Sequence, residues 1–288
     1  ANLNSAAATT GVKGNVVGSA TSATTSGVGN LSFNINLNGD GVKTVTVAAG
    51  STGAALATLI QNAVRGLTPT DAFRTAAYTG FTASVNAAGV FTFASGLAGV
   101  TDNSTASTGT VVVTANGADT LAANLNMLAG TSTTGTDFAI SDPTGTSNFS
   151  TSMTVYDSLG NNHLLTTYFT RVGNNTWNYN VTANSNDVVT ANYASANIDA
   201  TLGITRVGAG TLTFGTNGTL DRESVALRFD TGTAAGTAGT VPGQLLVDFN
   251  GATADQQITY NFGTSGTTEG GNGLDGTTQF GSQSAVGQ

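Results

Sequence analysis

The residues best suited to chemistry are Asp157 and His163, which flank the sequence S-L-G-N-N. His163 is the only histidine of the chain. A histidine oriented by a carboxylate can act as a general base, so the pair could serve acid–base catalysis. Catalysis would also need a nucleophile or a second acid and a shaped pocket, and no pattern in the sequence supplies them. We therefore favour a turn here, and predict no catalytic residue and no enzymatic activity.

Two segments could be taken for calcium sites. Asp157, Asn161 and Asn162 offer oxygen atoms, which Ca²⁺ prefers, but their spacing does not match an EF-hand loop and an Asx-turn explains them equally well. The sequence G-G-N-G-L-D at 270–275 matches the start of a calcium-binding β-roll repeat. That architecture needs several stacked copies, and the chain has one. We predict no metal site.

Aromatic residues could form a sugar-binding platform from Tyr168, Trp177 and Tyr179. At alternating spacing on paired strands, such residues more often fill one face of a sheet. The glycine-rich stretches never take the strand, glycine loop, lysine and helix order of a phosphate site. We predict no bound cofactor.

The composition indicates a β-rich protein with a real core. Hydrophobic residues make up 39% of the 288 residues, which is enough to bury a core, whereas charged residues make up only 8%, against about 25% in ordinary soluble domains. Thr and Val suit pleated surfaces, while Gly and Asn suit turns. This mixture is typical of secreted and surface structural proteins.

The charge and the missing residue types exclude several classes of protein. The net charge is -8, and the 8 Lys and Arg residues are spread from Lys13 to Arg228 without a cluster, so we predict no nucleic-acid partner and no binding to an anionic membrane. The absence of Cys excludes disulfide-stapled folds and thiolate metal sites. No run approaches the roughly 20 apolar residues of a membrane helix, and residues 1–5 lack the basic start of a signal peptide.

The first half of the chain mixes strand and helix patterns. A helix is predicted at 51–67, ended by Gly66 and Pro69. Its apolar residues recur at helical spacing: Leu56, Leu59, Ile60 and Val64. The other predicted elements are hairpins at 31–47 and 81–93, a strand at 110–114, and a short helix at 120–128 with Leu121, Leu125 and Leu128 on one face. Glycine-rich segments at 11–29 and 130–135 are predicted to be flexible linkers.

From residue 137 onward the helical period disappears. Strands are predicted at 152–156, 164–171, 176–183, 210–214, 225–229, 245–249 and 257–262. Many short strands separated by polar turns indicate a β-sandwich or barrel. Residues 263–288 are almost all small and polar, and we expect an extended or mobile exit.

An ordered set of motifs resembles the middle domain of bacterial flagellar hook proteins. The segment F-S-T-S-M-T-V-Y-D-S-L-G-N-N-H occupies residues 149–163. The further pieces are the opening A-N-L-N-S, L-L-T-T-Y-F at 164–169, N-T-W-N-Y at 175–179, L-T-F-G-T-N-G-T-L at 212–220, L-L-V-D-F at 245–249 and L-D-G-T-T-Q-F-G-S-Q-S at 274–284. The resemblance covers residues 1–10 and about 136–288. The pattern of the remainder is similar to the insert domains of flagellins and hook-associated proteins.

The resemblance implies a mainly β fold in two domains. Residues 1–10 and 136–275 would form a sandwich-like or barrel-like middle domain. Residues 11–135 would form a small inserted outer α+β domain. Residues 276–288 would lead toward a tube-core domain. The apolar heptads that build that core are absent from both ends, so we expect an outer fragment of a longer subunit, monomeric by itself.

The function implied is structural. Hook subunits assemble with identical copies into a curved extracellular tube, a universal joint that passes motor torque to the filament, and they also meet the hook cap and the hook–filament junction proteins. Flexing would occur in the two linkers. Alternatives are another surface structural protein, such as an adhesin, phage-tail or S-layer domain, or a carbohydrate-binding module.

Overall fold

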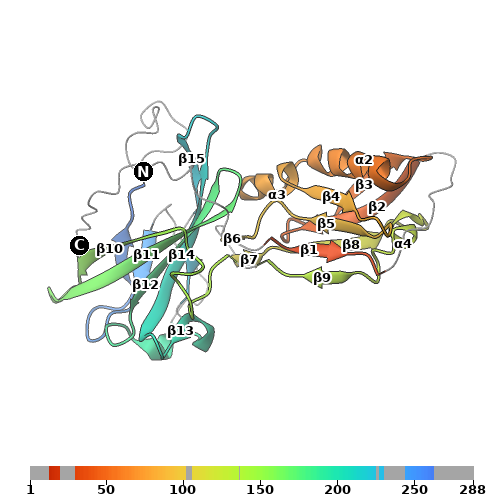
Figure 1. The fold of residues 1–288 in the computed structure, drawn as a ribbon. Helices are drawn as coiled ribbons and strands as arrows, with labels where there is room; N and C mark the ends of the chain where they lie inside the picture. The colour runs from red at the N-terminus through yellow and green to blue at the C-terminus, as the bar shows by residue number, and fades with distance from the viewer. Residues whose placement is uncertain are drawn as a thin grey trace. The chain divides into compact units, whose positions relative to one another are not determined.

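The computed structural model describes residues 13–19, 30–101, 106–135, 137–224, 227–229 and 244–262. They fall into two compact units (Figure 1). The first unit comprises the described residues of 13–100 and 107–135. The second unit comprises those of 137–262 together with Thr101 and Ala106. The predicted leading residues 1–10, the calcium-like sequence at 270–275 and the exit at 276–288 lie outside the described residues.

The first unit contains a three-stranded antiparallel sheet. Its order is β3 (Lys43–Ala48), β2 (Asn30–Leu37) and β8 (Val111–Ala115). From Phe33 onward every second residue of β2 is buried, namely Phe33, Ile35 and Leu37, as a strand with one face on a core requires. The β2–β3 turn places Asn38 and Gly39 at positive φ, 51° and 73°, which these residue types tolerate best. The predicted hairpin at 31–47 and strand at 110–114 are confirmed.

Helices of the first unit bury one face each. The helix α2 (Gly53–Arg65) buries Leu56, Ile60 and Val64, as predicted, but Leu59 is 37% exposed. The short helix α4 (Leu121–Asn124) ends early, so Leu128 is 50% exposed instead of sharing the buried face. Two further turns of helix were not predicted: η1 (Ala72–Arg74) and α3 (Thr75–Thr79).

A second sheet of this unit contradicts the linker prediction for residues 15–17 and 131–133. Its order is β4 (Thr82–Val85), β5 (Phe91–Ala94), β1 (Asn15–Val17) and β9 (Thr131–Thr133). The strands β4 and β5 are the predicted hairpin at 81–93. The strands β1 and β9 lie within the two predicted linkers and pair with each other. A separate small hairpin joins β6 (Gly99–Thr101) and β7 (Ala106–Thr108).

The glycines of these two segments permit close packing, which explains why the linker prediction was wrong. A Cβ atom on Gly14 would lie 1.9 Å from the carbonyl oxygen of Gly109, and one on Gly130 would lie 2.6 Å from that of Val17. Side chains are excluded there because the backbones approach one another. Val16, the middle residue of β1, has a buried side chain.

The second unit is built on a seven-stranded antiparallel sheet. Its main path runs β10 (Phe149–Tyr156), β11 (Asn162–Gly173), β12 (Thr176–Asn184), β14 (Ile204–Phe214) and β13 (Ile198–Asp199). Both β15 (Leu220–Glu223) and β16 (Leu227–Arg228) pair with β14. The 3₁₀ turns η2 (Thr190–Asn192) and η3 (Ser195–Asn197) precede β13. Sequence patterns missed β13, β15 and the first half of β14.

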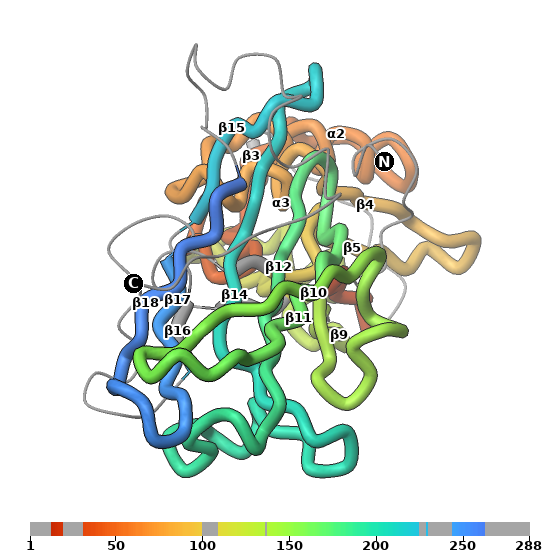
Figure 2. The backbone as a smooth tube through the Cα atoms, turned by 90° about the vertical axis from the view of Figure 1, so that its left-hand side faces the viewer, coloured from red at the N-terminus to blue at the C-terminus, as the bar shows by residue number. Residues whose placement is uncertain are grey.

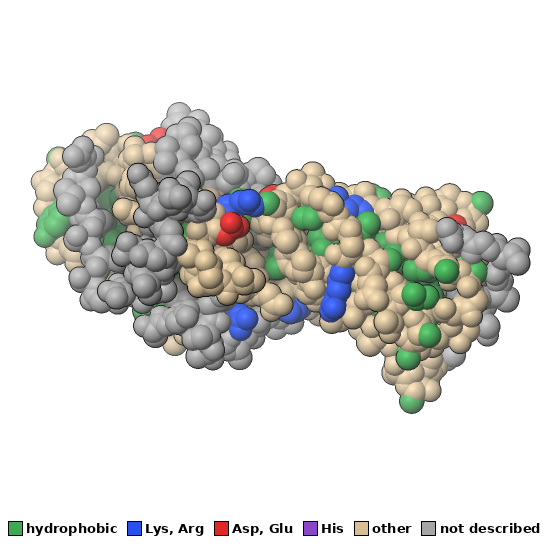
Figure 3. All heavy atoms as spheres, turned by 90° about the horizontal axis from the view of Figure 1, so that it is seen from above, with side chains coloured by type: hydrophobic (Ala, Val, Ile, Leu, Met, Phe, Trp, Pro, Cys, Tyr) green, Lys and Arg blue, Asp and Glu red, His purple; other side chains and the backbone are tan. Residues whose placement is uncertain are grey.

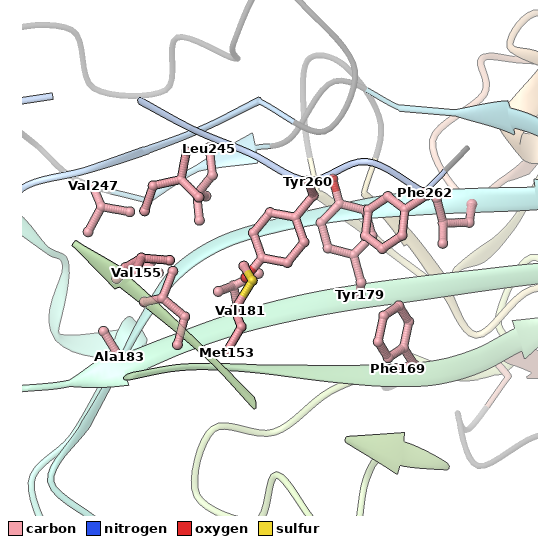
Figure 4. Close-up of a cluster of buried hydrophobic side chains, with 14 of the residues drawn as sticks. Met153, Val155, Phe169, Tyr179, Val181, Ala183, Leu245, Val247, Tyr260 and Phe262 are labelled. Atoms are coloured by element: carbon pink, nitrogen blue, oxygen red, sulfur yellow. The ribbon is translucent and has the colours of Figure 1, made fainter. Parts of the chain in front are cut away.

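A separate two-stranded sheet, β17 (Gln244–Val247) and β18 (Gln256–Thr259), supplies the second layer (Figure 2). Its apolar residues share one core with Trp177, Tyr179 and Phe169 of the large sheet. Figure 4 shows Leu245, Val247, Tyr260 and Phe262 facing Met153, Val155, Phe169, Tyr179, Val181 and Ala183. The rings of Tyr179 and Phe262 lie 5.1 Å apart. The predicted mainly β fold class is confirmed.

Candidate functional site

The β10–β11 hairpin places Asp157 and His163 on its tip. Val155 pairs with His163, and the backbone N–H of Asp157 donates to the carbonyl of Asn161 at 2.9 Å. One carboxylate oxygen, Oδ1 of Asp157, accepts the backbone N–H groups of Leu159 at 2.8 Å and Asn161 at 2.9 Å. This is the Asx-type turn that the sequence favoured.

The second carboxylate oxygen of Asp157 faces two side chains. Its Oδ2 accepts from Asn161 Nδ2 at 2.9 Å and lies 3.1 Å from His163 Nε2. Desolvation of the carboxylate tends to raise its pKa, but the hydrogen bonds from the side chains of Asn161 and His163 and from the backbone outweigh it. The pKa of Asp157 is therefore held well below its usual range.

The His163 ring is enclosed by three segments. It stacks on Phe249, just after β17, with ring centroids 4.1 Å apart and planes 11° from parallel. Its Nδ1 lies 3.4 Å from Oδ2 of Asp187, in the loop after β12. With a carboxylate against each ring nitrogen, the ring has no nitrogen directed at open solvent. Asn162 is exposed at the start of β11 and lies outside this cluster.

Further hydrogen bonds join the hairpin tip to the β17–β18 hairpin. Gln256 Nε2 donates to the carbonyl of Tyr156 at 2.6 Å, and the backbone N–H of Ser158 donates to Gln256 Oε1 at 2.8 Å. The N–H of Thr253 donates to Ser158 Oγ at 2.9 Å.

We refer to Asp157, His163, Asp187, Phe249 and Gln256 as the tip clasp. Sequence reasoning did not place the last three at the hairpin tip, because they are distant from it in the chain; Phe249 belongs to the motif at 245–249, but nothing in that motif indicates a contact with His163.

The aromatic candidates do not share a face. Trp177 and Tyr179 are buried in the core. Tyr168 pairs across the sheet with Asn180, so its side chain points to the opposite face, where its ring lies 5.8 Å from that of Phe138. The prediction that these rings fill a sheet face is correct for two of them. A platform formed by all three is contradicted.

Two partly buried ionisable groups, Glu223 and Arg206, lie elsewhere in the second unit. Burial raises the pKa of Glu223 to about 8 and lowers that of Arg206 to about 10. The Arg206 guanidinium lies over the rings of Phe229, 4.2 Å from its centroid, and Phe138, at 5.4 Å. These contacts attach β14 to neighbouring segments of the unit.

Among the described residues, no group of three or more His, Cys, Asp and Glu side chains is placed to hold a metal ion. No helix among them is long and apolar enough to cross a membrane. The described residues of the second unit form a β-rich module whose most distinctive polar cluster, the tip clasp, joins the β10–β11 hairpin to neighbouring loops.

Comparison with known protein families identifies the module. Residues 121–288 match the flagellar basal body protein FlaE D2 domain family, and the chain belongs to this family. Comparison with curated proteins gave no match. Among solved structures, the chain is similar to the 32 kDa fragment of the flagellar hook protein FlgE from Caulobacter crescentus, with 18% identity over 77% of this chain and 72% of that chain. The TM-score of 0.27 is too low for a common arrangement to follow from this likeness.

Family membership confirms the resemblance to flagellar hook proteins drawn from the sequence motifs. The chain is a structural subunit of the extracellular flagellar hook. Its family is a structural one whose subunits assemble with identical copies.

Proposed function

We propose that this chain forms the surface-exposed domains of a hook subunit, in the curved tube that works as a universal joint and passes torque from motor to filament. In this proposal, residues 1–10 and 136–275 form the middle domain and residues 11–135 form an inserted outer domain. Residues 276–288 lead toward the tube core. The hook cap and the hook–filament junction proteins would be partners of the assembled subunit.

The observation that carries the proposal is the family match over residues 121–288, which includes every described residue of the second unit from 137 onward. The first unit lies mostly before the match, and its strands β1 and β9 pair with each other. Such pairing brings the beginning and the end of the unit together, as expected for a domain inserted into another.

Surface chemistry supports a role in contacts that must rearrange as the tube bends. Only 8% of the residues are charged, and the described part of the face in Figure 3 carries few charged side chains, with scattered hydrophobic side chains among uncharged polar and backbone atoms. Contacts between such surfaces rely on water-mediated hydrogen bonds of modest strength, which exchange at low cost. Because β1 pairs with β9, residues 15–17 and 131–133 are not free hinges, and the proposal assigns flexing to contacts between subunits.

The surface location can be tested by thiol labelling, because the chain contains no cysteine. Val42→Cys in the first unit and Leu202→Cys in the second replace side chains that are 67% and 50% exposed. Ala77→Cys and Ala209→Cys are matched controls at buried positions. Each variant is expressed in the flagellated cell that carries this gene, and intact hooks are treated with a maleimide dye.

We expect both exposed cysteines to label on assembled hooks and both buried ones to label only after denaturation. Hooks that assemble normally but exclude the dye from both exposed positions would contradict the surface location. The torque role is tested on cells of the same variants without dye treatment, by cross-linking the free cysteines of neighbouring subunits with a bifunctional maleimide. If cross-linked hooks bend and drive filament rotation as freely as untreated ones, sliding contacts at these positions are not needed for the hook to bend or to transmit torque.

A further inference from the structure

The two ring nitrogens of His163 face carboxylates from two different loops. Nε2 lies 3.1 Å from Asp157, in its own hairpin, and Nδ1 lies 3.4 Å from Asp187, after β12. A neutral imidazole carries one N–H and can donate to only one of them, whereas the doubly protonated ring donates to both. We propose that His163 is a proton-dependent link that holds these two loops together when its ring is positively charged.

The surroundings fix the ring and one of its partners. Stacking on Phe249 orients the imidazole, and an aromatic face also attracts a cationic ring. Asp157 is held by three donors besides the histidine: the N–H groups of Leu159 and Asn161 and the side chain of Asn161. Its position therefore does not depend on the proton.

Asp187 is the partner that can leave. Its side chain is 33% exposed, so water can replace the imidazolium. When the ring loses a proton, one nitrogen presents a lone pair to a carboxylate, which is repulsive. Because Asp157 is held by other donors, the Asp187 loop separates from the ring.

A further carboxylate stands one residue from Phe249 in the chain. Asp248 precedes Phe249, and its oxygens accept from Asn192 Nδ2 at 2.9 Å and from the backbone N–H of Asp255 at 2.6 Å. Among the described residues, the groups found at the ring are Asp157 of the hairpin, Asp187 of the loop after β12 and the uncharged Phe249 after β17. Both carboxylates attract the ring when it is positively charged.

The direction of the pH effect follows from the geometry. A positively charged ring attracts the carboxylates on both sides, so the link between the two loops should be stronger at mildly acidic than at mildly alkaline pH. Acid strong enough to protonate the carboxylates would also break the contact between His163 and Asp187. The hook lies outside the cell, so this contact would respond to the pH of the surroundings.

The test is amide hydrogen exchange on the 288-residue chain, at about pH 5 and about pH 8, with rates corrected for the intrinsic effect of pH. The probes are the backbone amide of Asn250, which donates to the carbonyl of Asp187, and that of Val189, which donates to Asp248. We compare the unmodified chain with Asp187→Asn and His163→Gln. Asp221→Asn is the control, since it makes the same charge change at an exposed position of β15.

In the unmodified chain and in Asp221→Asn, we expect protection of both amides to be severalfold higher at about pH 5 than at about pH 8, because only the doubly protonated ring can donate to both carboxylates. In Asp187→Asn and His163→Gln, protection should be nearly independent of pH. If His163→Gln fails to fold, Asp187→Asn alone tests the proposal, because the Asp187 side chain is partly exposed and its replacement should leave the fold intact. An unchanged pH dependence in Asp187→Asn, or none in the unmodified chain, would overturn the proposal.

Discussion

Val16 lies directly opposite Ser132 on adjacent antiparallel strands, although almost the whole first unit separates them in the sequence. Val16 also pairs with Phe93 on its other side, so β1 is an interior strand. A segment that composition marks as a linker therefore anchors the sheet.

Truncation of Val16 should destabilise the first unit. Val16 is 3% exposed, and Val16→Ala removes two buried methyl groups, so we expect a loss of about 1–3 kcal/mol in the free energy of unfolding. Val42→Ala makes the same chemical change where the side chain is 67% exposed, and should cost less than about 0.5 kcal/mol. Urea denaturation of both variants checks this. Equal stabilities would mean that β1 does not support the unit.

Glycine substitutions should separate close packing from flexibility. Gly14→Ala places a Cβ 1.9 Å from the backbone of Gly109, so we expect a loss of more than about 2 kcal/mol or failure of the unit to fold. Gly66→Ala is the matched control, because its nearest neighbours would lie at an ordinary 3.5 Å and its φ of -81° suits alanine. Melting temperatures of the two variants provide the comparison. If Gly14→Ala is tolerated as well as Gly66→Ala, the linker hypothesis regains support.

Acid sensitivity should depend on Asp157. Its folded-state pKa is depressed, so its contribution to stability is present above the unfolded value of about 3.9 and is lost as the pH falls toward the folded value. Asp157→Asn should therefore lower stability at neutral pH and flatten its decline in acid. Urea midpoints recorded as a function of pH measure both effects. Asp221→Asn should keep the acid profile of the unmodified chain, and an identical profile for Asp157→Asn would refute the assignment.

Glu223 should act in the opposite sense. Burial raises its pKa to about 8, so the folded state holds a proton that the unfolded chain releases near the ordinary value of about 4.3. Stability should decline between those two values as the pH rises. Glu223→Gln, which is neutral at every pH, should be more stable than the unmodified chain at about pH 8 and differ little at about pH 4. Thermal unfolding at both pH values tests this, with Asp221→Asn on the same strand as the control.

Much of the fold could be predicted because its signals are local. The alternation of β2, the helical spacing of Leu56, Ile60 and Val64, and the D-S-L-G-N turn each reflect burial or hydrogen bonding within a few residues. Predictions failed where a short element depended on distant partners. The three residues of β1 have too little alternation to be recognised, and Leu59 has helical spacing but lies at the edge of the buried stripe.

By itself, the sequence determined the mainly β class, the hairpin that carries Asp157 and His163, and the motifs that identify the flagellar hook family, because periodicity and turn chemistry are properties of contiguous residues. Only the tertiary structure decided that β1 and β9 pair and that Trp177 and Tyr168 point to opposite faces. It also brought Asp187, Phe249 and Gln256 around the hairpin tip. These are contacts between segments far apart in the chain, and they form only when the core between the two layers brings those segments together.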